Sequence, residues 1–199
     1  MLISLYMEKK QIITIAGSLG SGKSSTANKV AELLGYSRAS TGDFMRSLAD
    51  KKGITLEDLS KIAENDNGAT DKEIDDNSRA IREKSNIVLD SRLGFFFIPE
   101  SFKVFLELDP KIAAERILKD SKNNPNRQKE TDTGFDSVES VVIGISERRA
   151  SEQKRYQKLY GIADNTAPEN FDLVINTANT PLESVALKIV EEYNKWLNS

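Results

Sequence analysis

Residues 17–24 read GSLGSGKS and fit the pattern G-x-x-x-x-G-K-[ST], which binds phosphate groups. The glycines allow the backbone to form a tight, concave loop whose N–H groups point at an anion. Lys23 can place an ammonium at the β- and γ-phosphates of a nucleoside triphosphate, and Ser24 can offer a hydroxyl to Mg²⁺. The stretch therefore predicts a triphosphate site with contacts from Gly17, Ser18, Leu19, Gly20, Ser21, Gly22, Lys23, Ser24 and Ser25.

The flanking residues predict a strand before this loop and a helix after it. Residues 11–16 (QIITIA) form a β-branched run suited to a buried strand. After Lys23, apolar residues recur at helical spacing up to Gly35, a typical helix end. Strand, glycine loop and helix form the order that the motif requires, so the alternative of a Gly/Ser-rich surface turn is rejected.

Composition limits the chemistry that the chain can perform. Its 199 residues suit a single domain, and a net charge of −3 gives no basic excess of the kind that binds nucleic acid. The chain has no cysteine, hence no thiolate nucleophile or disulfide, which fits a reducing, cytoplasmic location. It also has no histidine, the usual general base near neutral pH. No apolar run approaches the length of a membrane span.

Further along, strand and helix patterns alternate. Helix starts are expected at Thr41 and Thr55, at a capping box formed by Thr70 and Glu73, and at Thr180. Residues 121–134 are polar, without periodicity, and predict a loop. We expect strands at residues 11–16, 37–40, 86–90, 103–108 and 173–175, and helices from residues 23, 41, 55, 70, 110, 138 and 182.

This alternation predicts an α/β fold with a parallel sheet between two layers of helices. Ligands of such sheets bind at the carboxyl ends of the strands. The phosphate-binding loop, residues 41–46 and residues 90–92 all follow predicted strands, so we expect them to converge. No Asn-Lys-x-Asp guanine reader is present, which argues against a guanine-nucleotide switch. A carboxylate–arginine cluster and an arginine-bearing helix in a short chain favour a small-molecule kinase.

The chain resembles the nucleoside monophosphate kinases, and among them the short, archaeal-type cytidylate kinases. The resemblance runs from Ile12 to about Tyr193. Its most distinctive part is RYQKLYGI followed by DLVINT. The matching segments are 17–24, 40–46 (STGDFMR), 71–75 (DKEID), 90–93 (DSRL), 114–117 (AERI), 155–162 (RYQKLYGI) and 172–177 (DLVINT).

The resemblance implies phosphoryl transfer from ATP to CMP or dCMP with Mg²⁺, on a five-stranded parallel sheet of order 2-3-1-4-5. Residues 1–199 would form one domain, with an acceptor-binding helical region at about 41–84 and a mobile lid at about 119–160. It implies catalytic roles for Lys23, Arg92, Arg148 and Arg155, acceptor contacts from Thr41, Asp43, Arg46, Asp75 and Arg92, Mg²⁺ binding by Ser24 and Asp90, and an ATP-base contact by Arg116.

Several alternatives stay open at this point. Arg149 is more typical of a solvated helix surface, and residues 95–97 (FFF) are more typical of core packing than of base stacking. Asp71 and Asp75 fit a contact with the cytosine amino group or a surface position equally well. The expected partners are small nucleotides, without nucleic acid or membrane, for a monomer or weak dimer. Rival functions are another small-molecule kinase, of adenylate, shikimate or dephospho-coenzyme A type, and a catalytically silent nucleotide-binding regulator.

Overall fold

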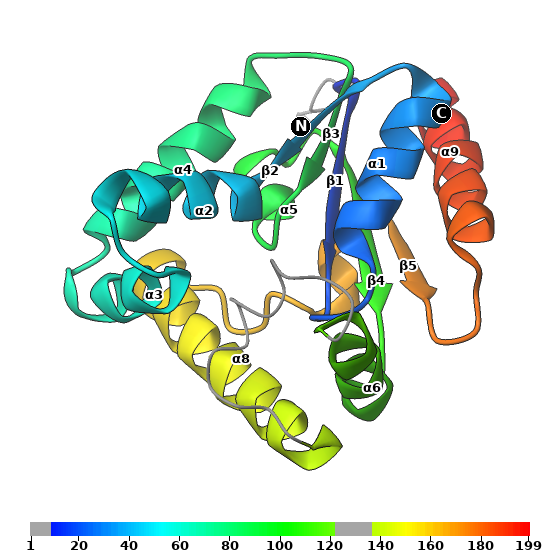
Figure 1. The fold of residues 1–199 in the computed structure, drawn as a ribbon. Coiled ribbons are helices and arrows are strands. Elements are labelled where there is room, and N and C mark those ends of the chain that lie inside the picture. The colour runs from blue at the N-terminus through cyan, green and yellow to red at the C-terminus, as the bar shows by residue number, and fades with distance from the viewer. Residues whose placement is uncertain (1–8, 122–136) are drawn as a thin grey trace.

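The structure, a computed structural model, describes residues 9–121 and 137–199, in which strands and helices alternate as predicted (Figure 1). The strands are β1 (Ile12–Gly17), β2 (Ser37–Ser40), β3 (Ile87–Asp90), β4 (Phe102–Glu107) and β5 (Leu173–Asn176). The helices are α1 (Lys23–Leu34), α2 (Thr41–Lys52), α3 (Leu56–Asn65), α4 (Ala69–Arg82), α5 (Gly94–Phe97), α6 (Pro110–Ser121), α8 (Val138–Tyr160), the 3₁₀ turn η1 (Pro168–Asn170) and α9 (Leu182–Asn198).

The sheet is parallel throughout and has the order β2-β3-β1-β4-β5, which confirms the expected order. β1 lies in the centre, with Ile15 opposite Asp90 of β3 and Gly17 opposite Leu106 of β4. In a parallel sheet all strands end at the same edge. The loops after β1, β2 and β3 therefore open on one side of the molecule.

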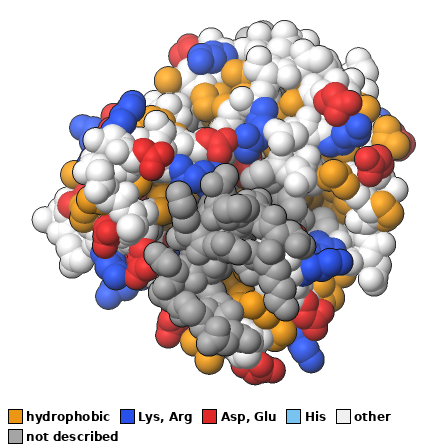
Figure 2. All heavy atoms as spheres, in the orientation of Figure 1, with side chains coloured by type: hydrophobic (Ala, Val, Ile, Leu, Met, Phe, Trp, Pro, Cys, Tyr) orange, Lys and Arg blue, Asp and Glu red, His pale blue; other side chains and the backbone are white. Residues whose placement is uncertain are grey.

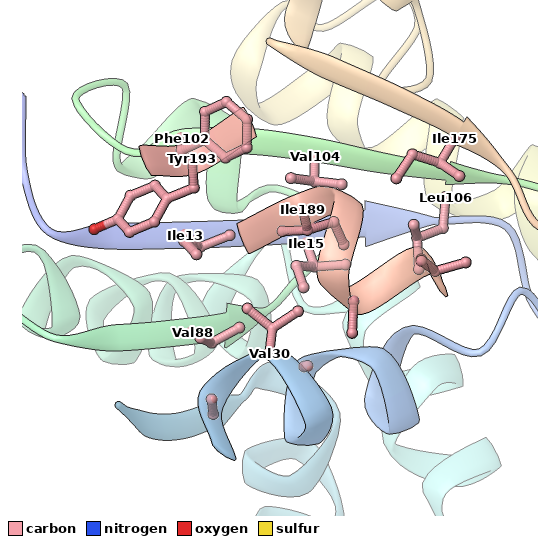
Figure 3. Close-up of a cluster of buried hydrophobic side chains, with 14 residues drawn as sticks. Ile13, Ile15, Val30, Val88, Phe102, Val104, Leu106, Ile175, Ile189 and Tyr193 are labelled. Atoms are coloured by element: carbon pink, nitrogen blue, oxygen red, sulfur yellow. The ribbon is translucent and has the colours of Figure 1, made fainter. Parts of the chain in front are cut away.

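One face of the sheet is covered by α1 and α9 (Figures 1 and 3). Alternate residues of the central strands point into this layer, as the two-residue period of a strand requires. Figure 3 shows Ile13, Ile15 and Val104 facing Ile189 and Tyr193 of α9. This cluster is fully buried and fixes β1, and thus the loop that follows it.

The opposite face packs against α5 and the last turns of α4 and α8. Ile12 and Leu89 of the sheet pack with Phe97 of α5 and Tyr156 of α8. Phe97 also contacts the ring of Tyr160 edge-on, at 5.6 Å between ring centroids. Phe97 is thus in the core and Phe95 packs against it, in agreement with the core interpretation of this triplet, whereas Phe96 is 41% exposed.

Two smaller clusters hold the outlying helices. Leu48 and Leu59 bury the contact between α2 and α3, and Val141 of α8 packs against Ala114 and Ile117 of α6. α8 therefore extends from α6 at one end to the sheet and α4 at the other (Figure 1).

Three expected helix caps are wrong by one to four residues. The cap of α2 is Ser40, whose hydroxyl accepts a hydrogen bond from the Asp43 amide, while the Thr41 hydroxyl turns away to the Asp90 carbonyl. α4 begins at Ala69, and its free amides are bonded by the carboxylate of Asp66 instead of a box at Thr70. At α9, Pro181 occupies the cap position. Adjacent Ser, Thr and Asp residues are all good caps, so the sequence pattern alone does not choose among them.

The predicted loop at 121–134 falls almost wholly outside the described residues, as does the part of the expected lid between α6 and α8. Across the described residues, no helix combines the length and apolar character needed to cross a membrane. On the face shown in Figure 2, basic and acidic side chains of the described residues are intermingled, without a continuous basic surface.

Candidate active site

The loop between β1 and α1 has the backbone conformation that a phosphate-binding loop needs. Gly22, at the start of α1, has φ 86°, in the left-handed region that favours glycine. At Gly17 a Cβ would lie 2.5 Å from the carbonyl oxygen of Leu106, so a side chain would collide with β4. Gly22 thus needs glycine for the tight turn that the sequence pattern indicated, and Gly17 needs it because β4 lies so close.

Lys23 lies in the first turn of α1 and folds back over this loop. Its Nζ donates hydrogen bonds to the carbonyl oxygens of Gly17, at 2.9 Å, and Ser18, at 3.1 Å. Burial and the nearby positive charge of Arg92 lower the pKa of Lys23 to about 8, although Asp90 and Glu152 oppose this. The ammonium is therefore held by neutral carbonyls in a site that favours an incoming anion.

Ser24 and Asp90 meet as the metal prediction requires. The Ser24 hydroxyl donates to Oδ2 of Asp90 at 2.6 Å, and the Asp90 side chain is only 8% exposed. The described residues contain no group of three or more acidic, His or Cys side chains that could hold a metal by themselves. One hydroxyl and one carboxylate fit Mg²⁺, which keeps several waters and takes further oxygens from substrate phosphates.

The residues of α2 that are predicted to bind the acceptor are connected to the same aspartate. Thr41 donates to the main-chain oxygen of Asp90 at 3.2 Å, and Arg46 forms an ion pair with Asp43. Asp43 also accepts a hydrogen bond from Arg38 of β2 at 2.7 Å. Burial pushes the pKa of Asp43 up, but the hydrogen bonds from Arg46 and Arg38 outweigh it, so that pKa lies below its ordinary value.

Glu152 of α8 is a site residue that the sequence analysis missed. It forms ion pairs with Nε of Arg92 and Nε of Arg148, each at 3.1 Å. Burial raises its pKa, but the two arginines outweigh burial, and the pKa of Glu152 stays below its ordinary value. Two predicted phosphate arginines from different elements thus share one carboxylate. Only the spacing of four between Arg148 and Glu152 hinted at this in the sequence.

The other predicted arginine of α8, Arg155, contacts α4, within the region predicted to bind the acceptor. Its Nε lies 3.3 Å from the carboxylate of Asp71 on α4, and both side chains are largely buried. One turn further, the Tyr160 hydroxyl donates to Asp75 at 2.6 Å. Burial raises the pKa of Asp75 to about 6, although this hydrogen bond opposes the shift. Both carboxylates are thus buried between α4 and α8, where neither lies on the surface.

Arg116 lies on the other side of the phosphate-binding loop, near the end of β5. Its guanidinium donates to the carbonyl oxygens of Thr177, at 2.7 Å, and Ala178, at 2.9 Å. This places it on α6 beside the loop after β5, apart from the acceptor-side residues. Arg149 is largely exposed and donates to the hydroxyl of Thr166 at 2.8 Å.

A cavity of about 520 Å³ lies between the phosphate-binding loop, the start of α6 and the middle of α8. Arg92, Arg148 and Glu152 line it, together with Gly17 and Ser18 of the loop. Arg149 also lines it, so this residue borders the cavity in addition to being exposed. The predicted phosphate-binding loop, the Ser24–Asp90 pair, Arg92 and Arg148 therefore converge at the carboxyl edge of the sheet. Arg155 lies between α4 and α8, as Asp75 does, and Arg116 lies beside the end of β5.

Comparison with known proteins finds relatives over most of this chain. A family model described as an AAA domain matches residues 13–140. The cytidylate kinase of Natronomonas pharaonis is 36% identical over 188 residues, covering 93% of this chain and 90% of its own. The S-adenosylmethionine-dependent nucleotide dehydratase of Lacinutrix mariniflava is 34% identical over 188 residues, which are 94% of this chain but 36% of that longer protein.

Among solved structures, the shikimate kinase of Bacteroides thetaiotaomicron has the same fold, with a TM-score of 0.59 over 94% of this chain and 98% of that one. Its sequence is 12% identical, so this likeness concerns the fold alone. Several archaeal cytidylate kinases, between 32% and 36% identical to this chain, match it over most of its length. The chain therefore belongs to the family of short, archaeal-type cytidylate kinases, which are P-loop kinases.

Proposed function

We propose that this protein transfers the γ-phosphoryl group of ATP to the phosphate of CMP or dCMP, giving ADP and CDP or dCDP. The observation that carries the proposal is the convergence of Lys23, Arg92 and Arg148 at the carboxyl edge of the sheet, beside the Ser24–Asp90 pair. The names of the archaeal relatives support cytidine as the acceptor base.

The reaction needs no general base. An anionic oxygen of the acceptor phosphate attacks the γ-phosphorus, and a P–O bond forms while the bond to the β-phosphate oxygen breaks. The electron pair of the broken bond leaves with ADP. Catalysis then depends on positioning and on stabilising negative charge, which a chain without histidine can do with lysine and arginine.

Each charged residue has a distinct part in this proposal. Lys23 binds the β- and γ-phosphates when its ammonium leaves the loop carbonyls for the stronger acceptors that phosphate oxygens offer. Arg92 and Arg148 contact the transferring group, and Arg46 binds the acceptor phosphate through its planar fork. Mg²⁺, held by Ser24 and by Asp90 through water, would neutralise charge on the triphosphate.

The position of α8 suggests how water is excluded. Arg148 lies on the same helical face as Arg155, which already contacts Asp71 of the acceptor-side helices. A helix that carries a phosphate arginine and also contacts the acceptor side can close over both substrates together. Closure of this kind suppresses the transfer of phosphate to water.

The test is ADP formation from Mg·ATP with CMP, dCMP, UMP, AMP, GMP, shikimate and dephospho-coenzyme A as separate acceptors. We expect CMP or dCMP to give kcat/KM at least about tenfold above that of any other acceptor, since one well-placed polar contact discriminates by at least that factor. Preferred turnover of another acceptor would contradict the cytidine assignment and keep the phosphoryl transfer.

Two rival functions predict different results in the same experiment. Another small-molecule kinase would prefer AMP, shikimate or dephospho-coenzyme A. A silent nucleotide-binding regulator would bind ATP without turnover of any acceptor. The dehydratase relative supports a nucleotide ligand without supporting dehydration, because nearly two thirds of that protein lies outside the alignment.

A further inference from the structure

Arg38 connects two carboxylates that belong to different parts of the site. It lies on β2, an edge strand, and its side chain is 22% exposed. One terminal nitrogen donates to Oδ2 of Asp43 at 2.7 Å, and the other donates to Oδ2 of Asp90 at 3.4 Å. The same oxygen of Asp90 accepts the hydroxyl of Ser24 at 2.6 Å. The guanidinium is therefore fixed between the metal-side carboxylate and the acceptor-side carboxylate.

This position matters because of the charge that an acceptor brings. A nucleoside monophosphate is close to a dianion at neutral pH, since its second phosphate pKa is about 6. Asp43 and Asp90 place two further negative charges beside its expected position. Like charges at such short distances oppose binding, and more strongly where water is partly excluded. A cation that contacts both carboxylates removes much of that repulsion.

The contacts of Arg38 also leave part of its guanidinium unused. Its Nε is buried and has no hydrogen-bond partner among the described residues. An arginine present only to tie β2 to its neighbours would normally have its buried donors satisfied, because an unpaired buried donor costs free energy. The arrangement therefore leaves this buried Nε donor unsatisfied, which a purely structural arginine would not explain.

We propose that Arg38 is a positioning residue for the acceptor phosphate: it orients Asp43 and Asp90 and offsets their charge, so that a dianionic monophosphate can bind beside them. The inference rests on the proposed function, but it holds for any phosphomonoester acceptor. Arg38 lies outside the phosphate-binding motif and outside the set of residues expected from the sequence.

The test compares Arg38→Met, which removes the charge, with Arg38→Lys, which keeps the charge without the two-pronged geometry. The matched control is Arg82→Met. Arg82 pairs with Glu100 at the opposite end of the sheet, so this variant also removes an arginine–carboxylate pair but lies far from the site. For each variant, calorimetry measures CMP binding without ATP or Mg²⁺, and steady-state kinetics measures the acceptor KM and kcat.

We expect Arg38→Met to weaken CMP binding and raise the acceptor KM by roughly tenfold, the size of one lost charge-assisted contact, with kcat changed by less than about threefold. Arg38→Lys should recover part of the affinity, and Arg82→Met should bind CMP as the wild type does. High salt should narrow the difference between the wild type and Arg38→Met, because screening weakens repulsion between charges.

Three outcomes would overturn the inference. In the first, Arg38→Met binds CMP as tightly as the wild type, which leaves the proposed function intact. In the second, Arg38→Met and Arg82→Met weaken CMP binding equally, which would mean that CMP affinity depends on the stability of the protein and not on where the arginine lies. In the third, the wild type neither binds nor phosphorylates any monophosphate, and the proposed function fails together with the inference.

Discussion

Lys23 illustrates how a single residue is adjusted by its surroundings. Its ammonium is held by the carbonyl oxygens of Gly17 and Ser18, and its pKa falls to about 8 because of burial and of the charge of Arg92. At pH 7 Lys23 therefore keeps its proton, but its pKa lies only about one unit above the pH. The pKa of an ordinary lysine lies more than three units above it.

The lowered pKa of Lys23 predicts an alkaline limit to catalysis. The profile of kcat/KM against pH reports the pKa values of the free enzyme, so kcat/KM for Mg·ATP should fall above about pH 8 as Lys23 loses its proton. At pH 9.5 we expect a loss of roughly thirtyfold relative to pH 7. Steady-state rates at low ATP concentration, measured across this range, provide the test.

The control is Lys23→Arg, whose side chain stays charged throughout this range. This variant should be less active but should show no fall between pH 7 and 9.5. A wild-type profile that stays flat to pH 9.5, or an equal fall in both proteins, would show that Lys23 does not set the limit.

At the residue scale, the sequence predicted the site best where a contiguous motif exists. Lys23 and Ser24 are placed by their own loop, and the position of Asp90 beside Ser24 follows from its place at the end of a buried strand. Arg38 and Glu152 were missed because their partners come from other segments. Neither the spacing nor the identity of neighbouring residues records that Glu152 meets Arg92, which is sixty positions away.

Among the elements, α8 makes contacts at both of its ends. Its first turns pack on α6 through Val141, and its last turns reach α4 through the Arg155–Asp71 and Tyr160–Asp75 contacts. Ser151, between these ends, donates a hydrogen bond to Glu64 of α3. The helix that carries the predicted phosphate arginines is thus tied to α3 and α4 by polar contacts, in addition to the apolar packing of Tyr156 beneath the sheet.

The contact between Asp75 and Tyr160 predicts a pH-dependent stability. The pKa of Asp75 is about 6 in the folded protein against 3.8 ordinarily, so folding takes up a proton between these values and stability falls as pH rises through that window. Above pH 6 the buried carboxyl is ionised, and this lowers the free energy of unfolding by about 3 kcal/mol, at 1.36 kcal/mol per pKa unit. Asp75→Asn cannot ionise, so it avoids this loss, and its amide oxygen still accepts the Tyr160 hydrogen bond. Urea unfolding should show this variant more stable than the wild type at pH 8, by up to that amount, but not at pH 4.

The neighbouring residue provides a matched control. Asp76 is exposed and pairs with Arg79 on the surface of the same helix, so Asp76→Asn should change stability by less than about 1 kcal/mol at both pH values. If Asp75→Asn stabilised the protein equally at pH 4 and pH 8, its effect would not come from the ionised carboxyl.

At the element scale, the sequence predicted the strands and most helices, because apolar periodicity records which face is buried. The helix starts were less certain. Ser40 and Thr41 are adjacent and chemically similar, and which of them caps α2 is decided by the contact of Thr41 with Asp90 from a distant strand. Local patterns hold no information on such a contact.

At the scale of the whole molecule, the candidate residues come from several loops that the sheet brings to one edge. The phosphate-binding loop follows β1, Thr41 and Arg46 follow β2, and Arg92 follows β3. If donor and acceptor meet at this edge, a single molecule that contains both should bind more tightly than the two substrates together. One linked molecule loses its translational freedom once on binding, whereas two separate substrates lose it twice.

We therefore expect a linked ligand, adenosine and cytidine joined through five phosphates, to raise Tm above the value with ATP and CMP at equal concentrations. A ligand at about a thousand times its Kd stabilises by about 4 kcal/mol, which corresponds to roughly 10 °C for a chain of this size. Thermal unfolding followed by circular dichroism measures the shift. The adenosine–adenosine analogue serves as control, and an equal shift with it would contradict the cytidine assignment.

The two halves of the sheet, on either side of the central strand β1, come from two separate stretches of the sequence. The strands on one side of β1, with the helices between them, occupy residues 37–97, while those on the other side begin at Phe102. Recombination near residue 99 would therefore transfer residues 37–97 as one block, with Arg38, Arg46 and Arg92 kept together. If these residues bind the acceptor as proposed, one such event would carry an acceptor preference from one lineage to another. α8 would then meet Asp71 and Asp75 from a different parent, so these two contacts would have to be kept in a hybrid.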